Sequence, residues 1–84
     1  MARSLSLRQM ATNFTRQAAA YDRLAKKQND VARDMLQDNT ATADQLQAAI
    51  VMYDMAVRSY YTADSMEQQA AAYSQKADDA GELP

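Results

Sequence analysis

The feature that most constrains this sequence is a long stretch, residues 43–77, whose large side chains fall on two seams instead of one. In each seam the side chains recur at alternating intervals of four and three residues, as in a helix packed against another helix. The seams start six residues apart, which places them about 120° apart around a helix. A helix with one apolar stripe needs one neighbour, so two seams require a further helix from this chain or another copy. The first seam is Leu46, Ile50, Tyr53, Val57 and Tyr60, and the second is Met52, Ala56, Ser59, Ala63, Met66, Ala70, Tyr73 and Ala77.

The composition restricts the chain to one small helical domain without the usual catalytic groups. Its 84 residues include no cysteine, histidine or tryptophan, and the one glycine and one proline fall in the last four residues. With no breaker in the body of the chain and no β-hairpin signal, we expect an all-α fold. Without His or Cys, the common bases, nucleophiles and transition-metal ligands are missing, so we expect no enzyme, no metal site and no cofactor. Asp30, Asp34 and Asp38 lie four residues apart, which we interpret as a solvated face.

Charge is divided unevenly along the chain. Residues 1–37 carry seven basic and three acidic residues, a net charge of +4, and residues 38–84 carry two basic and eight acidic residues, a net charge of −6. A basic helix beside an acidic one favours an antiparallel pairing, within the chain or between copies. The acidic residues within the basic half argue against nucleic-acid binding. No apolar run approaches the roughly 20 residues that span a membrane, and the N-terminal residues lack the apolar centre of a signal peptide.

The first helix is predicted over about residues 6–37. Ser6 and Gln9 fit a capping box, with Ser6 as the N-cap. A heptad pattern then runs through nine positions, seven of which are apolar or aromatic. The other two, Gln17 and Gln28, are expected at the edge of this seam. The seven that we assign to the core of a hairpin are Leu7, Met10, Phe14, Tyr21, Leu24, Val31 and Met35.

A polar turn over residues 38–42 leads to the second helix, predicted over about residues 43–77. Asn39 tolerates a left-handed backbone and is expected to end the first helix. Thr42 and Gln45 fit a second capping box. A short connection between two long helices makes them antiparallel neighbours, so we predict a coiled-coil-like two-helix hairpin.

The hairpin is predicted to form a single domain over residues 1–84, ending in an acidic tail. Residues 78–84 contain three acidic side chains, which oppose the dipole at the end of a helix. Gly81 and Pro84 are expected to stop the helix. We therefore expect residues 78–84 to be frayed.

The two seams of the second helix are assigned separate roles. We place the first seam, Leu46, Ile50, Tyr53, Val57 and Tyr60, in the hairpin core, facing the first helix. We place the second seam in contacts with other subunits. The pattern alone does not say which seam faces inward, so the reverse assignment stays open. The residues predicted to contact other subunits are Met52, Ala56, Ala63, Met66, Ala70 and Tyr73.

The size of the chain favours a function in assembly. Domains of about 70–80 residues or fewer usually need disulfides, a metal or oligomerisation for stability. This chain lacks cysteine and the usual ligands of a structural metal, so packing on copies of itself remains. We predict a structural subunit that forms a homo-oligomer or a filament. The alternative is a small cytosolic helical chaperone or adaptor that binds a helix of a partner.

The second helix also carries a family resemblance, over about residues 36–62. Leu46-Gln47, Ile50 and Tyr53 resemble a Leu-Gln-x-x-Φ-x-x-Tyr pattern, where Φ is aliphatic, in type III secretion needle and inner-rod subunits. Those subunits are short helical hairpins that stack into a hollow helical filament. The resemblance implies a needle-like or rod-like filament, a possible helical chaperone as partner, and synthesis in the cytoplasm without a cleaved signal peptide. It further implies a secreted or cell-surface location; without it, we expect a cytoplasmic protein.

Overall fold

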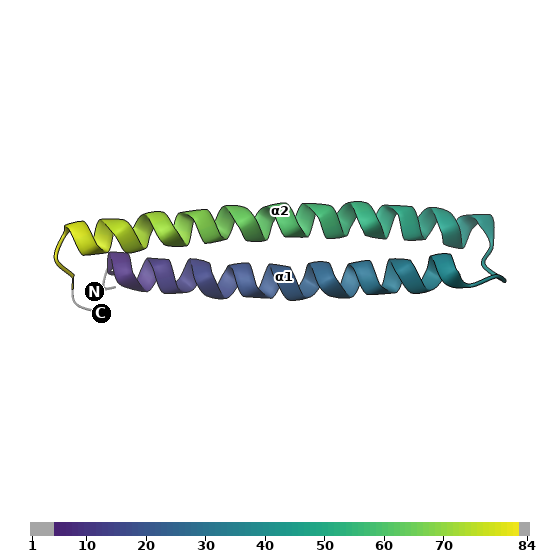
Figure 1. Cartoon of the computed structure of the whole chain (residues 1–84), viewed down its shortest axis with the longest axis horizontal. Helices are drawn as coiled ribbons and strands as arrows, with labels where there is room; N and C mark the ends of the chain where they lie inside the picture. Colours follow the sequence, from purple (N-terminus) through teal and green to yellow (C-terminus); the bar gives the residue numbers. More distant parts are fainter. Residues whose placement is uncertain (1–4, 83–84) are drawn as a thin grey trace.

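The computed structural model describes residues 5–82 and consists of two long antiparallel helices. Helix α1 spans Leu7–Gln37 and helix α2 spans Ala43–Asp79. They lie side by side along their length, and Figure 1 shows the connection at one end and the two ends of the described chain at the other. The molecule measures 59 × 27 × 15 Å. No strand occurs among the described residues, and the predicted all-α antiparallel hairpin is confirmed.

Both helices begin with the capping boxes that the sequence predicts. The Ser6 hydroxyl accepts a hydrogen bond from the Gln9 N–H at 3.0 Å, and the Gln9 side chain accepts one from the Ser6 N–H at 2.9 Å. Thr42 and Gln45 make the same reciprocal pair at 3.2 and 2.7 Å. These bonds satisfy backbone donors that have no partner within the first turn of a helix. Helix α1 therefore starts at Leu7, one residue after the predicted boundary, because Ser6 is its cap.

The end of α1 differs from the prediction. Asp38 has an extended backbone at the C-cap, and no residue other than glycine has a positive φ within residues 5–82. The prediction that a left-handed Asn39 ends the first helix is therefore wrong. Instead, the Asp38 carboxylate accepts bonds from the Thr40 hydroxyl at 2.7 Å and the Thr40 N–H at 2.9 Å, which shapes the turn. These two bonds hold the pKa of the Asp38 carboxylate below its ordinary value of 3.8, and the bond from the Thr40 hydroxyl has the larger effect.

Helix α2 ends at Asp79, two residues beyond the predicted end at about residue 77. Gly81 follows the C-cap residue, Ala80. The Glu82 N–H donates to the Ala77 carbonyl at 2.9 Å, and the Gly81 N–H donates to the Asp78 carbonyl at 3.0 Å. These two bonds form a Schellman motif, which needs a left-handed residue after the cap. Gly81 supplies it with φ 73°, so the predicted role of this glycine is confirmed. Pro84 lies outside the described residues.

Alanine, at every seventh position of both helices, forms the contact between α1 and α2. Within residues 5–82, every buried residue is an alanine except Gln28 and Ser59. A heptad repeat keeps a residue on the side that faces a partner helix, and the distance between two helix axes depends on the side chains at their contact. We name these residues the heptad alanines: Ala11, Ala18, Ala25 and Ala32 in α1, and Ala49, Ala56, Ala63, Ala70 and Ala77 in α2.

Two side-chain contacts between the helices lie beside the heptad alanines. The rings of Phe14 and Tyr73 stack with centroids 5.5 Å apart and an interplanar angle of 11°. The Ser59 hydroxyl donates to the Gln28 side-chain oxygen at 2.9 Å, and both residues are buried. Gln28 was expected at the edge of its seam, and that prediction is wrong, because Ser59 gives its side chain a partner inside the contact. Gln17 is exposed.

The seam of α2 that faces α1 is the second, so our assignment of the first seam to the hairpin core is wrong. The second seam faces α1, since Ala56, Ala63 and Ala70 are buried there and Met52, Met66 and Tyr73 are half-buried. Only this seam contains alanine at every seventh position, so only this side lets α1 approach closely. The predicted subunit-contact residues are therefore part of the hairpin's own interface.

The predicted hairpin core holds only in part. In α1, Leu7, Met10, Phe14 and Met35 are half-buried, whereas Tyr21, Leu24 and Val31 are exposed. Leu24 and Val31 each precede a heptad alanine by one residue, a rotation of about 100°. They therefore lie at the border of the contact. The core prediction is wrong for these three residues of α1 and for Leu46, Ile50, Val57 and Tyr60 of α2, all of which are exposed.

Candidate interaction surfaces

The first seam of α2 forms an exposed apolar ridge, which we define as Leu46, Ile50, Tyr53, Val57 and Tyr60. Ile50 is 56% exposed, Val57 49% and Tyr60 47%, and Tyr53 is half-buried. Four of the five ridge side chains are thus exposed, although most of them to less than half of their area. A contiguous exposed apolar surface on a small protein marks a contact with another molecule. The ridge is the first candidate interaction surface.

A groove between the two helices forms a second apolar surface. Leu24, Gln28 and Val31 line it from α1, with Lys27 at its side, and Met52 and Met55 line it from α2. Leu24, Val31 and Met55 are exposed, whereas Gln28 is buried at the base. Methionine is flexible and polarisable, so it adapts to irregular apolar partners. Met55 was not among the predicted site residues.

The ridge and the groove face different directions. Ile50 precedes Met52 by two residues, and Val57 follows Met55 by two residues. Two residues along a helix correspond to a rotation of about 200°. Each of these ridge side chains therefore points away from its neighbour in the groove. One hairpin consequently presents two separate apolar surfaces, and one partner helix cannot cover both.

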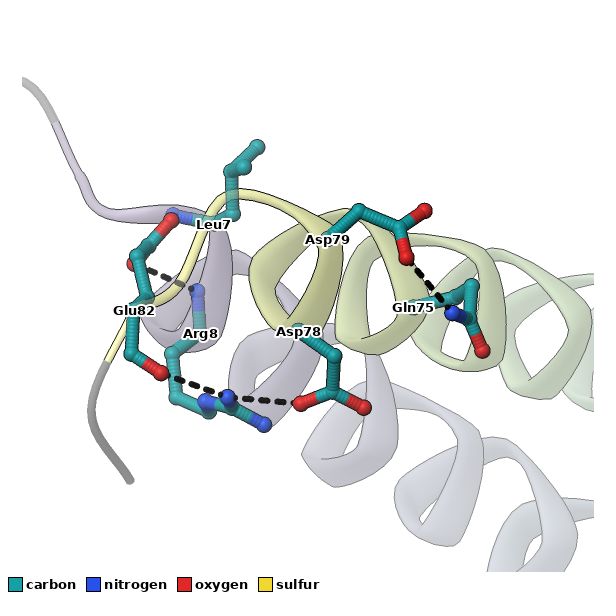
Figure 2. Close-up of polar contacts among 6 residues, drawn as sticks. All are labelled: Leu7, Arg8, Gln75, Asp78, Asp79 and Glu82. Atoms are coloured by element: carbon teal, nitrogen blue, oxygen red, sulfur yellow. Dashed lines mark hydrogen bonds and ion pairs between the residues drawn. The ribbon is translucent and has the colours of Figure 1, made fainter.

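At the open end of the hairpin, the C-terminal tail is bonded to the start of α1 (Figure 2). The Glu82 carboxylate accepts bonds from the N–H groups of Leu7 at 3.2 Å and Arg8 at 3.3 Å. The Arg8 guanidinium donates to the Asp78 carboxylate at 2.8 Å and to the Glu82 carbonyl at 2.9 Å. A carboxylate at the N-terminus of a helix is favoured by the helix dipole. The tail was predicted to be frayed; that is wrong for residues 78–82, and residues 83–84 lie outside the described chain.

The two helices carry opposite net charge. Helix α1 has six basic and three acidic residues, a net charge of +3, and helix α2 has two basic and six acidic residues, a net charge of −4. Within the described chain only one ion pair, Arg8 with Asp78, joins the helices, and the other two lie within single helices. Most of the charge thus remains free to act on another molecule.

Neither a metal-binding cluster nor a membrane-spanning helix occurs among the described residues. Between residues 5 and 82, no three His, Cys, Asp or Glu side chains gather closely enough to hold a metal ion. Asp30, of the acidic face considered above, pairs with Arg33 at 3.3 Å. Neither α1 nor α2 is long and apolar enough to span a membrane.

Comparisons of the chain with protein-family models, with curated proteins and with solved structures found no match. The features of the molecule that bear on function are the ridge, the groove and the charge of the two helices.

Proposed function

We propose that the chain is a structural subunit that assembles with copies of itself through its exposed apolar surfaces. The carrying observation is the contrast between the alanine contact inside the hairpin and the large side chains outside it. Burying an alanine removes about one methyl group from water, worth about 0.8 kcal/mol, whereas fully burying Leu, Ile, Val, Phe or Met stabilises by about 1.5–3 kcal/mol. Many of the side chains with most to gain from burial thus remain exposed in the single hairpin, and assembly would bury them.

The exposed area supports this proposal. The chain exposes 6309 Å², whereas a compact monomer of its mass, 9.3 kDa, is expected to expose about 5000 Å². The excess of about 1300 Å² compares with the about 800 Å² that each partner buries in a standard protein interface. The surplus surface therefore exceeds what one standard contact buries.

The more specific form of the proposal is a needle-like or rod-like filament of a secretion apparatus. The residues that carry the resemblance to needle and inner-rod subunits, Leu46, Ile50 and Tyr53, belong to the ridge, where another subunit would reach them. On this proposal the subunit is made in the cytoplasm without a cleaved signal peptide and is then exported.

The groove favours one alternative, a small helical chaperone or adaptor. Its lining from both helices, with two methionines, suits an amphipathic helix of a different protein. Such a protein would stay small by itself and would become more stable with its partner. A self-assembling subunit would grow as its own concentration rises.

The test is the size and thermal stability of the purified chain over a concentration series. We expect sedimentation to show species that grow with concentration. Circular dichroism should show helix with a broad melt in dilute solution, which sharpens and shifts upward as association stabilises the folded state. A chain that remains monomeric at every concentration, with a sharp and concentration-independent melt, would contradict self-assembly.

A further inference from the structure

We propose that the ridge of one copy docks into the groove of the next, so that the copies join head to tail. This inference rests on the self-assembly proposed above and identifies its two complementary surfaces. The groove is open between α1 and α2 and is lined by Leu24, Val31, Met52 and Met55. The ridge is a row of side chains spaced four and three residues apart, which is how a helix presents itself to a groove.

Charge identifies a second copy of this chain as the occupant of the groove. Lys27 borders the groove, and Arg23 lies one turn before it on the same face of α1. The row of ridge side chains continues along α2 into Asp64 and Glu67, four and seven residues after Tyr60. The positive border of the groove therefore meets its opposite charge on the ridge helix of another copy, which carries a net −4.

The same charges fix an orientation. If α2 of the second copy lies antiparallel to α1, its ridge covers Leu24 and Val31. Asp64 then extends beyond Leu24 towards Arg23. A groove docked on a second groove would instead bring two Lys27 side chains into one interface, and no acidic residue lines the groove.

The separation of the two surfaces makes the contact heterologous. Because the ridge points away from the groove, a hairpin whose groove is occupied still presents its own ridge. A head-to-tail contact generates a closed ring or an open filament, and it cannot stop at a symmetric dimer.

Two variants test this inference, each disabling one surface. The ridge variant carries Ile50→Glu and Val57→Glu, and the groove variant carries Leu24→Glu and Val31→Glu. All four positions are exposed, so we expect each variant to keep the helicity of the hairpin in dilute solution. The altered ridge of one variant and the altered groove of the other both carry glutamates. They therefore repel each other and cannot form a substitute contact in the mixture. Leu5→Glu, at an exposed aliphatic position before α1 and outside both surfaces, is the matched control and should assemble like the unmodified chain.

We expect each variant alone to sediment as a monomer, and an equal mixture of the two to form a 1:1 dimer that grows no further. The intact groove of the ridge variant and the intact ridge of the groove variant make one contact, after which both free surfaces are blocked. If one variant still associates with itself and the mixture yields no heterodimer, the docking is symmetric and this inference is wrong, while self-assembly stands. Assembly of both variants at the unmodified level would also overturn it.

A monomeric unmodified chain would instead refute the proposed function, so the two failures are distinguishable. Should a glutamate variant lose helicity, the neutral pairs Ile50→Gln with Val57→Gln and Leu24→Gln with Val31→Gln replace it. They remove the apolar contact without adding charge, and the same pattern of monomers and 1:1 dimer is expected from them.

Discussion

Glu82 shows how a single residue ties the two ends of the hairpin together. The first backbone donors of α1 all have partners, because Glu82 binds the N–H groups of Leu7 and Arg8 and the capping box of Ser6 binds those nearby. The carboxylate reaches α1 because the left-handed Gly81 turns the chain back after α2. One glycine and one acid, both far along the sequence from α1, thus complete its N-terminus.

We predict that Glu82→Ala lowers the free energy of unfolding by about 1 kcal/mol, the usual value of a side chain that caps a helix and complements its dipole. Thermal or urea unfolding, followed by circular dichroism at fixed protein concentration, measures this change. Asp79→Ala is the control, because that carboxylate lies at the C-terminal end of α2, where a negative charge opposes the dipole. Equal losses in the two variants would show that Glu82 has no special role at α1.

At the scale of the helix, the heptad alanines set the contact between α1 and α2. Ala25 is buried without any exposed surface, and interiors packed as closely as this do not admit extra methylene groups without strain. We predict that Ala25→Leu destabilises the hairpin by about 1–3 kcal/mol, by forcing the two helices apart. The measurement is the midpoint of unfolding in dilute solution.

Ala20→Leu is the matched control for this change, because Ala20 is exposed on the same helix. Leucine and alanine have similar helix propensities, so the control should leave the stability nearly unchanged. If Ala25→Leu raised the stability, the alanine contact would not be tightly packed. The contact between α1 and α2 would then not depend on small residues at these positions.

The helices were predictable because their signals are local. Ser6 with Gln9, Thr42 with Gln45, and Gly81 each place a boundary through bonds within a few residues. The direction in which each seam faces is not local. Large side chains led us to place Ile50 and Val57 inside, whereas the alanine repeat from Ala49 to Ala77 decides the matter. That repeat was visible in the sequence, and weighing it would have selected the correct seam.

The groove and the hydrogen bonds of the C-terminal tail could not be predicted from the sequence, for a different reason. Both depend on how α1 and α2 are staggered, which brings Arg8 to Asp78 and Gln28 to Ser59. A residue pattern within one helix carries no information about this stagger. It follows from the contacts themselves, and these include a buried polar pair that the seam pattern did not predict.

At the scale of the whole molecule, the proposed assembly would use a different side of α2 from the side that packs on α1. Met66 lies on the side that faces α1 and is half-buried, whereas Val57 lies on the ridge and is 49% exposed. A charge forced into an apolar contact is costly unless it is paired. The same change at these two positions should therefore damage different properties.

We predict that Met66→Glu reduces the helicity and the unfolding midpoint of the dilute hairpin, because the carboxylate falls between α1 and α2. Val57→Glu should leave the dilute hairpin intact and remove the rise of the unfolding midpoint with concentration. Circular dichroism at two protein concentrations, with sedimentation at the higher one, measures both properties. If Met66→Glu spares the dilute hairpin while Val57→Glu unfolds it, the first seam faces α1 after all. Because the ridge would then be the hairpin's own core, that result would remove the basis for assembly through it.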